Sequence, residues 1–363
     1  MARIIRGAAL VFSIGLALHL ILPQIPGIER SFGLIFGASP VLMLAALFSE
    51  AASEACYAGV LGRTAGAVAG SGPSLRARRR RGIGPWFAFR LTVTGYGAAH
   101  VLPGGGAAAS AVAYGGLRGR GLDRARIALS LAVVAVLTYG ALGLLFAASL
   151  LYLLVDGDLG RAAAAATVLG LAIVAGAFLC GYAAYRNPRG VRRLLRRAAD
   201  GISSVVARVQ PGGWPGARTA ADALLTRVKD ALRATGEQLS RRPSEVARLS
   251  LLALGYWIFD ALCLILVFAA LGVKADPVSL LVAYGVATMA GSLPLTPGGI
   301  GVFEATMLAT LALLGEGSDA AVAVLGYRLF NFWLPIPLAA IFYPTLRWRP
   351  SSTAPTPDRK PPH

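Results

Sequence analysis

The amino-acid sequence predicts an all-α polytopic membrane protein with six full spans and two broken or re-entrant helical hairpins in an inverted repeat. The composition is the first of three observations behind this prediction. Of 363 residues, 14% are charged and 56% are hydrophobic, and the mean hydropathy is +0.65, whereas soluble domains carry about 25% charged residues. Too little polar surface remains to coat a soluble fold of this size. A conventional soluble enzyme is therefore excluded.

The second observation is the length of the apolar stretches. A bilayer core takes about 20 apolar helical residues to cross. Two apolar regions, 86–117 and 278–314, are each broken near the middle by Pro and Gly. No cleavable signal peptide is evident, so we expect the first apolar run to be retained as a span. Six uninterrupted stretches reach the required length: 7–25, 33–57, 127–155, 162–185, 249–272 and 320–346.

The third observation is the placement of the basic residues, which gives the net charge of +18 a topological meaning. Nearly all Lys and Arg fall on alternate connections, and the opposite connections hold only Arg30, Arg161 and Lys274 together with six acidic residues. Basic connections stay in the cytoplasm. We therefore expect both termini to be cytoplasmic in an inner (plasma) membrane protein, and nucleic-acid binding is not expected. The basic segments are 1–6, 63–90, 118–126, 186–248 and 347–363.

With this orientation the chain contains two copies of a span, a broken hairpin and a span, facing opposite ways. An offset of 194 residues also aligns Gly97, Pro103, Gly104 and Gly105 with Gly291, Pro297, Gly298 and Gly299. Paired interrupted segments in inverted halves indicate a substrate site near the bilayer midplane. The alternative is that each broken region is two full spans. The expected parts are an N-terminal span (1–32), a first repeat half (33–155), a linking span with a basic amphipathic cytoplasmic segment (156–248), a second repeat half (249–346) and a disordered cytoplasmic tail (347–363).

The sharpest local feature is the run Gly291-Ser-Leu-Pro-Leu-Thr-Pro-Gly-Gly-Ile-Gly-Val-Phe-Glu304. Its prolines end one half-helix, and its glycines allow a tight turn before a second half-helix begins. The amide groups and positive dipole end of that second half-helix suit an anionic group such as a lipid phosphate. The alternative is a kinked helix that packs closely through glycine.

This run, followed by Tyr327-Arg-Leu-Phe-Asn-Phe-Trp-Leu-Pro335, resembles the C-terminal signature of a flippase-like membrane family. Its best-known member is the transmembrane domain of lysylphosphatidylglycerol synthase. The resemblance covers about 33–346. It implies broken helices and a phospholipid or lipid-linked substrate. In the first hairpin, many relatives carry an acid and an arginine where this chain has three alanines at 107–109. By motif the resemblance points to Pro297, Gly298, Gly299, Gly301, Glu304 and Arg328.

Ionisable residues inside spans are costly and are candidates for function. Glu304, Asp260 and Arg328 fall inside apolar stretches, so we expect Arg328 to pair with a carboxylate. One hypothesis is that Arg328 alternates between Glu304 or Asp260 and a lipid phosphate; the alternative is a static ion pair. His100 lies beside the first Pro-Gly turn, next to Pro103, Gly104 and Gly105, and either relays protons, binds phosphate or bonds to freed backbone. Glu50 and Glu54 are expected to reach the solvated inner interface.

These features favour a translocator of an anionic or aminoacylated phospholipid or lipid-linked headgroup. The competing expectations are a membrane-embedded lipid transferase and a scaffold that recruits a cytosolic lipid-modifying enzyme. No enzymatic activity is expected, and the sequence predicts no catalytic residue, metal site or cofactor. The three scattered cysteines support neither a disulfide frame nor a metal site. Expected partners are the lipid and the membrane, with a separate cytosolic synthase or a second copy of the chain left open.

Overall fold

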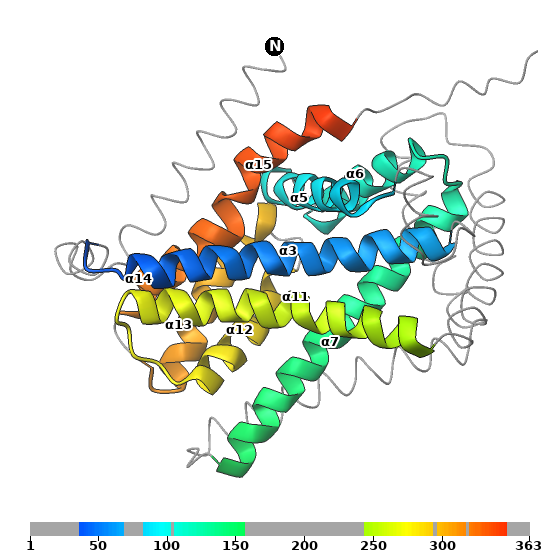
Figure 1. The fold of residues 1–363 in the computed structure, drawn as a ribbon. Helices are drawn as coiled ribbons and strands as arrows, with labels where there is room; N and C mark the ends of the chain where they lie inside the picture. Colours follow the sequence, from blue (N-terminus) through cyan, green and yellow to red (C-terminus); the bar gives the residue numbers. More distant parts are fainter. Residues whose placement is uncertain are drawn as a thin grey trace, which may run out of the picture.

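The computed structural model describes residues 36–68, 83–102, 105–156, 243–292, 296–316 and 319–346, and its regular elements in these ranges are all helices. The expected spans at 7–25 and 162–185, the tail 347–363 and nearly all of the amphipathic segment 186–248 lie outside the described residues. The molecule is thus described through its expected repeat halves (Figure 1).

Four helices in the described ranges are long and apolar enough to cross a membrane. They are α3 (Pro40–Val68), α7 (Arg124–Asp156), α11 (Pro243–Ala270) and a C-terminal segment from Ala320 to Leu346. Two of the expected boundaries need correction. The stretch predicted at 33–57 continues as a helix to Val68, and the helix predicted from 249 begins at Pro243. Proline suits a helix start because the amide hydrogens of the first turn have no acceptor within the helix, so the one that proline lacks is not missed there.

The two broken regions are pairs of short helices, as the Pro-Gly interruptions predicted. The first pair is α5 (Pro85–Val101) and α6 (Gly106–Arg118), with 17 and 13 residues. The second pair is α12 (Pro277–Gly291) and α13 (Val302–Leu313), with 15 and 12 residues, joined through the 3-10 turn η2 (Pro297–Gly299). Each of these helices is shorter than the roughly 20 residues that a full crossing takes. Their lengths therefore suit re-entrant hairpins.

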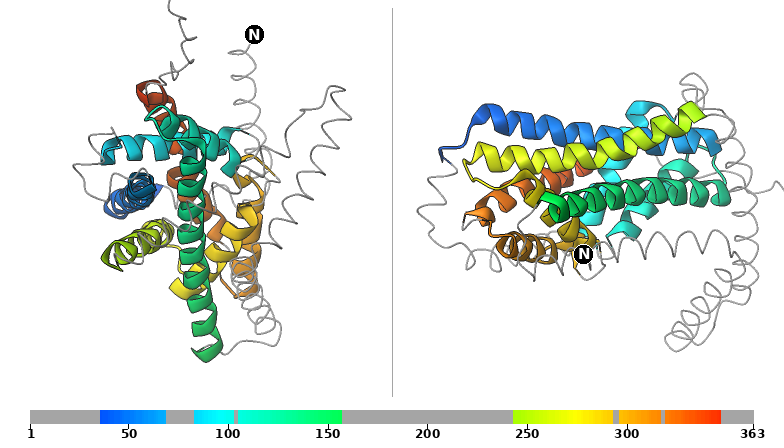
Figure 2. Two further views of the ribbon diagram at one scale, coloured as in Figure 1. Left: turned by 90° about the vertical axis from the view of Figure 1, so that its right-hand side faces the viewer. Right: turned by 90° about the horizontal axis from the view of Figure 1, so that it is seen from below.

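Helices α3 and α11 lie antiparallel, side by side along their length, as Figures 1 and 2 show. The amide of Ser39 donates to the Ala270 carbonyl at one end, and Arg63 pairs with Glu245 at the other, with 2.9 Å between Nη1 and Oε1. Between these ends, the Ser49 and Ser53 hydroxyls donate to carbonyl oxygens of α11, each at 2.7 Å. Small hydroxyl side chains let the two backbones approach closely and join them inside an apolar environment.

The C-terminal segment changes its winding at its centre. It runs through α14 (Ala320–Arg328), a five-residue π-helix η3 (Leu329–Trp333), α15 (Pro335–Phe342) and a short 3-10 turn η4 (Tyr343–Leu346). Pro335 has no amide hydrogen to give to an α-helical carbonyl one turn earlier. Short π-segments inside helices often mark functional sites. Here the segment directly follows Arg328.

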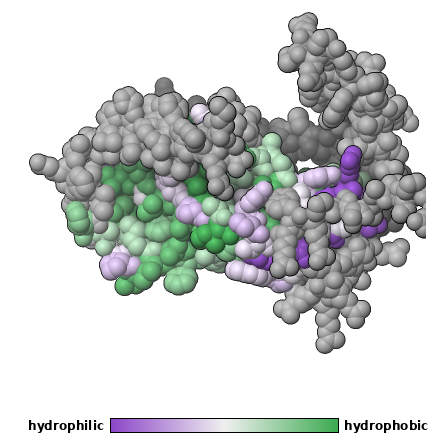
Figure 3. Space-filling model, turned by 90° about the horizontal axis from the view of Figure 1, so that it is seen from above, coloured by the Kyte–Doolittle hydropathy of each residue, from purple (hydrophilic) through white to green (hydrophobic). Residues whose placement is uncertain are grey.

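The surface of the described residues is apolar at one end and polar at the other (Figure 3). Side chains such as Phe48 on α3 and Val136 on α7 are more than two-thirds exposed, as lipid-facing positions are. Basic residues gather where α3 and α6 end and α7 and α11 begin, whereas the opposite connections carry mainly acids. The basic end holds Arg63, Arg118, Arg120, Arg124, Arg126 and Arg248.

Candidate functional site

A cavity of about 460 Å³ lies between the two broken hairpins. Its wall includes residues of both hairpins, together with residues of α3, α7, α11 and the C-terminal segment. This volume is within the range of roughly 300–1,000 Å³ that small-molecule sites occupy. Of the residues proposed from the sequence, the cavity brings together His100, Gly105, Asp260, Gly298, Gly299 and Arg328.

The turn of the second hairpin depends on glycine for its backbone and for its contacts. Gly298, Gly299 and Gly301 have φ angles of +58°, +71° and +82°, in the left-handed region that only glycine adopts at low cost. A Cβ atom at Gly298 would lie 2.5 Å from the Phe332 ring and 2.9 Å from the Cα atom of His100. The turn of one hairpin therefore touches the end of α5 in the other hairpin.

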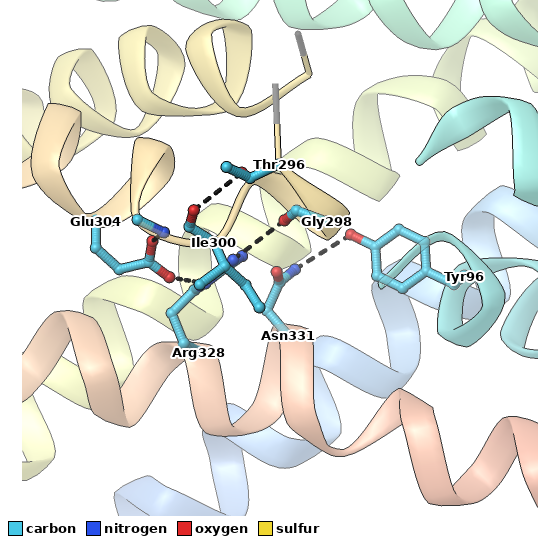
Figure 4. A network of polar contacts seen from close by, with 8 residues as sticks. Tyr96, Thr296, Gly298, Ile300, Glu304, Arg328 and Asn331 are labelled. Carbon is cyan, nitrogen blue, oxygen red and sulfur yellow. Dashed lines mark hydrogen bonds and ion pairs between the residues drawn. The ribbon is translucent and has the colours of Figure 1, made fainter. Parts of the chain in front are cut away.

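Arg328 forms the buried ion pair that the sequence predicted, and its partner is Glu304 (Figure 4). The Nε group of Arg328 donates to Glu304 Oε1 at 2.6 Å, and Nη2 donates to the Gly298 carbonyl at 3.3 Å. The guanidinium also lies over the rings of Phe303 and Phe332, at 4.8 and 4.4 Å from their centres. A guanidinium has five N–H donors, and these two bonds use only two of them. Arg328 therefore has further N–H donors with which it can bind an anion in the cavity.

Glu304 has a second role that the sequence analysis missed. Its Oε2 atom accepts a hydrogen bond of 2.7 Å from the amide of Gly301, which caps α13. An acid at the third position of a helix commonly closes the first turn in this way. The spacing Gly301-Val-Phe-Glu304 carries this signal in the sequence. At this half-helix start the Gly301 amide is therefore already bonded to Glu304 and is not free to bind an anion. Pro297 belongs to the turn but does not line the cavity.

The first hairpin also contains a helix start without a side-chain cap. Helix α6 begins at Gly106 after Gly105, which has φ of +44° and provides no side-chain cap. Both glycines line the cavity, and a Cβ atom added at either would meet nothing within 4 Å. The start of α6, with its positive dipole end and the amides that precede the bonded Ala108 amide, therefore lies at the cavity wall. The sequence signal was the run of glycine and alanine without a capping side chain. Pro103 and Gly104 lie outside the described residues.

Asp260 is not paired with Arg328. Its carboxylate accepts hydrogen bonds from the hydroxyl groups of Tyr284 at 2.5 Å and Tyr327 at 2.8 Å. The side-chain amide of Asn331 donates a third bond at 3.0 Å. Neutral donors thus stabilise Asp260. The sequence left Glu304 and Asp260 open as partners of Arg328, and in the structure Arg328 pairs with Glu304. Tyr327 and Asn331 were not singled out from the sequence, although their spacing of four places both on one helix face.

Glu50 and Glu54 are buried, contrary to the expectation that solvent would reach them. They are 4% and 5% exposed. The reason is the greater length of α3, which continues to Val68 and leaves both residues in its middle. Arg63 was counted with the basic cytoplasmic connection, but its pairing with Glu245 keeps it within the helix.

His100 lies in the last turn of α5 and is buried. Its ring is 4.3 Å from that of Phe332 and 4.7 Å from that of Tyr96, measured between centres. Its Nδ1 atom has no hydrogen-bond partner among the described residues. Because the residue lines the cavity, this nitrogen is a buried polar group without a partner in the described part of the chain.

Comparison with known proteins adds a family and several partial relatives. A family model described as the lysylphosphatidylglycerol synthase TM region matches residues 38–339. A UPF0104 membrane protein of Methanothermobacter thermautotrophicus is 33% identical over 93 residues, which cover 25% of this chain and 28% of that protein. The glycosyltransferase AglD of Haloferax volcanii is 36% identical over 91 residues, or 23% of this chain and 15% of AglD. The chain therefore spans less than a third of the length of either relative.

Proposed function

Because the chain belongs to the lysylphosphatidylglycerol synthase transmembrane-region family, we propose that this membrane protein translocates a phospholipid or lipid-linked headgroup with an anionic phosphate. The observation that carries the proposal is the cavity between the hairpins, which is lined by both Arg328 and the uncapped start of α6. A buried guanidinium and open helix amides are both groups that bind phosphate oxygens.

The cavity also has an opening that suits a lipid. Ser110 of α6 and Ala135 and Tyr139 of α7 line the cavity and are exposed on the surface. Ala135 and Tyr139 lie well inside the apolar span of α7. A headgroup can therefore enter between α6 and α7 while its acyl chains stay in the hydrocarbon.

We propose further that the described residues form the two halves of an inverted repeat. At the end of α6, the amides of Gly121 and Leu122 donate to the carbonyls of Arg118 and Leu117. At the end of α13 the same two bonds recur exactly 194 residues later along the chain, and Gly121 and Gly315 have φ of +82° and +79°. The antiparallel packing of α3 and α11 also supports this arrangement. The basic end then lies in the cytoplasm of the inner membrane, with both termini on that side.

The test is a leaflet-sidedness assay in proteoliposomes with labelled phosphatidylglycerol, lysyl-phosphatidylglycerol and phosphatidylcholine. We expect the purified chain to accelerate exchange of a lipid whose phosphate can reach Arg328, and Arg328→Gln to abolish it while the protein stays monodisperse. Arg248→Gln is the matched control, since its side chain is 63% exposed at the end of the molecule. Equal exchange by both variants would refute the proposal, and loss of fold with activity would favour a static ion pair.

The same vesicles separate the competing functions. AglD is named a glycosyltransferase. A transferase would change the mass of the labelled lipid, whereas a translocator changes only the leaflet in which the lipid lies. A scaffold would show no exchange in vesicles without a partner enzyme. We propose that the chain is not an enzyme, so the mass spectrum of the recovered lipid stays unchanged.

A further inference from the structure

Three buried carboxyl groups other than that of Glu304 lie on the packed helices α3 and α11. They belong to Glu50, Glu54 and Asp260, and each residue is at most 5% exposed. No Lys or Arg of the described ranges forms an ion pair with any of them. If all three were ionised, the apolar interior would hold three negative charges without a cation, which is costly.

Unpartnered oxygen atoms distinguish this cluster from an ordinary polar network. Glu50 Oε2 and both carboxyl oxygens of Glu54 are buried and have no hydrogen-bond partner among the described residues. The Asn331 amide donates to Glu50 Oε1 at 3.4 Å and to Asp260 Oδ1 at 3.0 Å, so one Nδ2 atom contacts both carboxyl groups. Ionised carboxylates have only acceptors, so such a group gains a donor only by taking up a proton. A proton is therefore the ligand that these atoms lack.

The position of the cluster favours a proton over a larger cation. Asp260 lines the cavity, whereas Glu50 and Glu54 do not. The Asn331 amide connects the two sides, because its Nδ2 atom lies 3.0 Å from Asp260 Oδ1 and 3.4 Å from Glu50 Oε1. The amide thus joins the acid at the cavity wall to one behind it. An ammonium group of a ligand in the cavity does not contact Glu50 or Glu54, because neither lines the cavity, whereas a proton adds directly to a carboxylate oxygen.

The cluster is also joined mechanically to the anion site. Asn331 contacts both acids and lies three residues after Arg328, within the π-helical segment that follows it. A phosphate that moves Arg328 acts on the same short segment. The negative charge of the phosphate also favours a proton nearby. Binding of the anion and of the proton should therefore strengthen each other, since coupling between two sites is reciprocal.

We propose that the Glu50–Asp260 pair, with Glu54 behind it, is a proton-binding site whose occupancy is coupled to the binding of an anionic headgroup at Arg328. This inference rests on the proposed function. In the coupling step one proton from the aqueous phase adds to a carboxylate and forms a carboxylic acid, and no other bond changes. The titratable or charged groups around the pair are Glu54 and Tyr57 of α3, Tyr96 and His100 of α5, Tyr256 and Cys263 of α11, Tyr284 of α12, and Tyr327 and Arg328 of α14.

The first experiment looks for the proton directly. Infrared spectroscopy of the full-length protein in detergent should show the carbonyl band of a buried protonated carboxyl group. Asp260→Asn and Glu50→Gln should each alter this band, whereas Asp123→Asn, at a half-exposed surface acid, should leave it unchanged. Absence of the band from the unsubstituted protein, or a band unaffected by both substitutions, overturns the inference whatever the protein transports.

The second experiment measures the coupling. Titration calorimetry with short-chain phosphatidylglycerol, in two buffers of different ionisation enthalpy, gives the number of protons taken up on binding. We expect net uptake in the unsubstituted protein and a smaller uptake in Glu50→Gln with binding retained. Binding without uptake overturns the coupling and leaves the translocation proposal intact. Absence of both binding and exchange, with the infrared band present, overturns the proposed function and the coupling but not the proton site.

Discussion

Replacing Gly298 by alanine tests whether the two hairpins meet as the structure has them. The substitution adds a Cβ atom 2.5 Å from Phe332 Cε2 and 2.9 Å from the Cα atom of His100. The phenyl ring can shift only if it leaves Arg328, which it covers, and the His100 contact is to backbone. The added methyl group must therefore separate the hairpins or distort the turn.

The expected cost has two parts. An alanine at φ of +58° costs about 1–2 kcal/mol because of the left-handed backbone. Overpacking a tight interior costs about 1–3 kcal/mol more. Gly121→Ala is the matched control, since that residue has φ of +82° and open space around the added atom. The control should lose only the backbone part.

The assay is thermal or denaturant unfolding of both variants in the same detergent, measured by circular dichroism and by monodispersity. We expect Gly298→Ala to lose about 1–3 kcal/mol more free energy of unfolding than Gly121→Ala, which is the overpacking part alone. Equal losses would show that the turn of the second hairpin does not touch His100. The geometry of the cavity would then be wrong.

Two further predictions concern the anion site and its opening. Glu304→Gln keeps an oxygen for the Gly301 amide but leaves Arg328 as a buried unpaired cation, which costs about 3–5 kcal/mol. Anionic short-chain lipid should therefore raise the melting temperature of this variant more than that of the unsubstituted protein. An equal increase in both proteins would contradict the ion-pair exchange. In a background without native cysteines, Ser110→Cys should react with a water-soluble maleimide, and short-chain phosphatidylglycerol should slow that reaction. A cysteine at Ala132, which is exposed on α7 outside the cavity, should show no such protection.

The features that the sequence predicted correctly are those with local or unavoidable causes. Clustered proline and glycine residues break a helix more surely than single ones, so the breaks near Pro103 and Pro297 followed from the chain alone. Arg328 is a cation in an apolar stretch, and such a charge requires a partner. The ion pair with Glu304 could therefore be anticipated, although Asp260 could not be set aside.

The features that escaped the sequence depend on neighbours distant along the chain. Glu50 and Glu54 were placed at a solvated interface because they fall late in the stretch predicted at 33–57. The helix continues to Val68, where Arg63 pairs with Glu245 on another helix, so both acids lie in its middle and are buried. Asp260 likewise takes its donors from α12 and the C-terminal segment. Periodicity cannot show which hydroxyl groups a carboxylate will meet.

The double role of Glu304 bears on whether its ion pair is static. A carboxylate that lost its only cation in a buried site would be left unpaired, and a pair of that kind resists exchange. Glu304 instead divides its oxygens, with Oε1 bonded to Arg328 and Oε2 bonded to the Gly301 amide. If a phosphate draws Arg328 away, the capping bond and the positive end of α13 still stabilise the carboxylate. The free energy that is lost when Arg328 leaves Glu304 is thereby reduced, and the rings of Phe303 and Phe332 also contact the guanidinium. This geometry favours an arginine that moves between Glu304 and a ligand over one fixed in a structural pair.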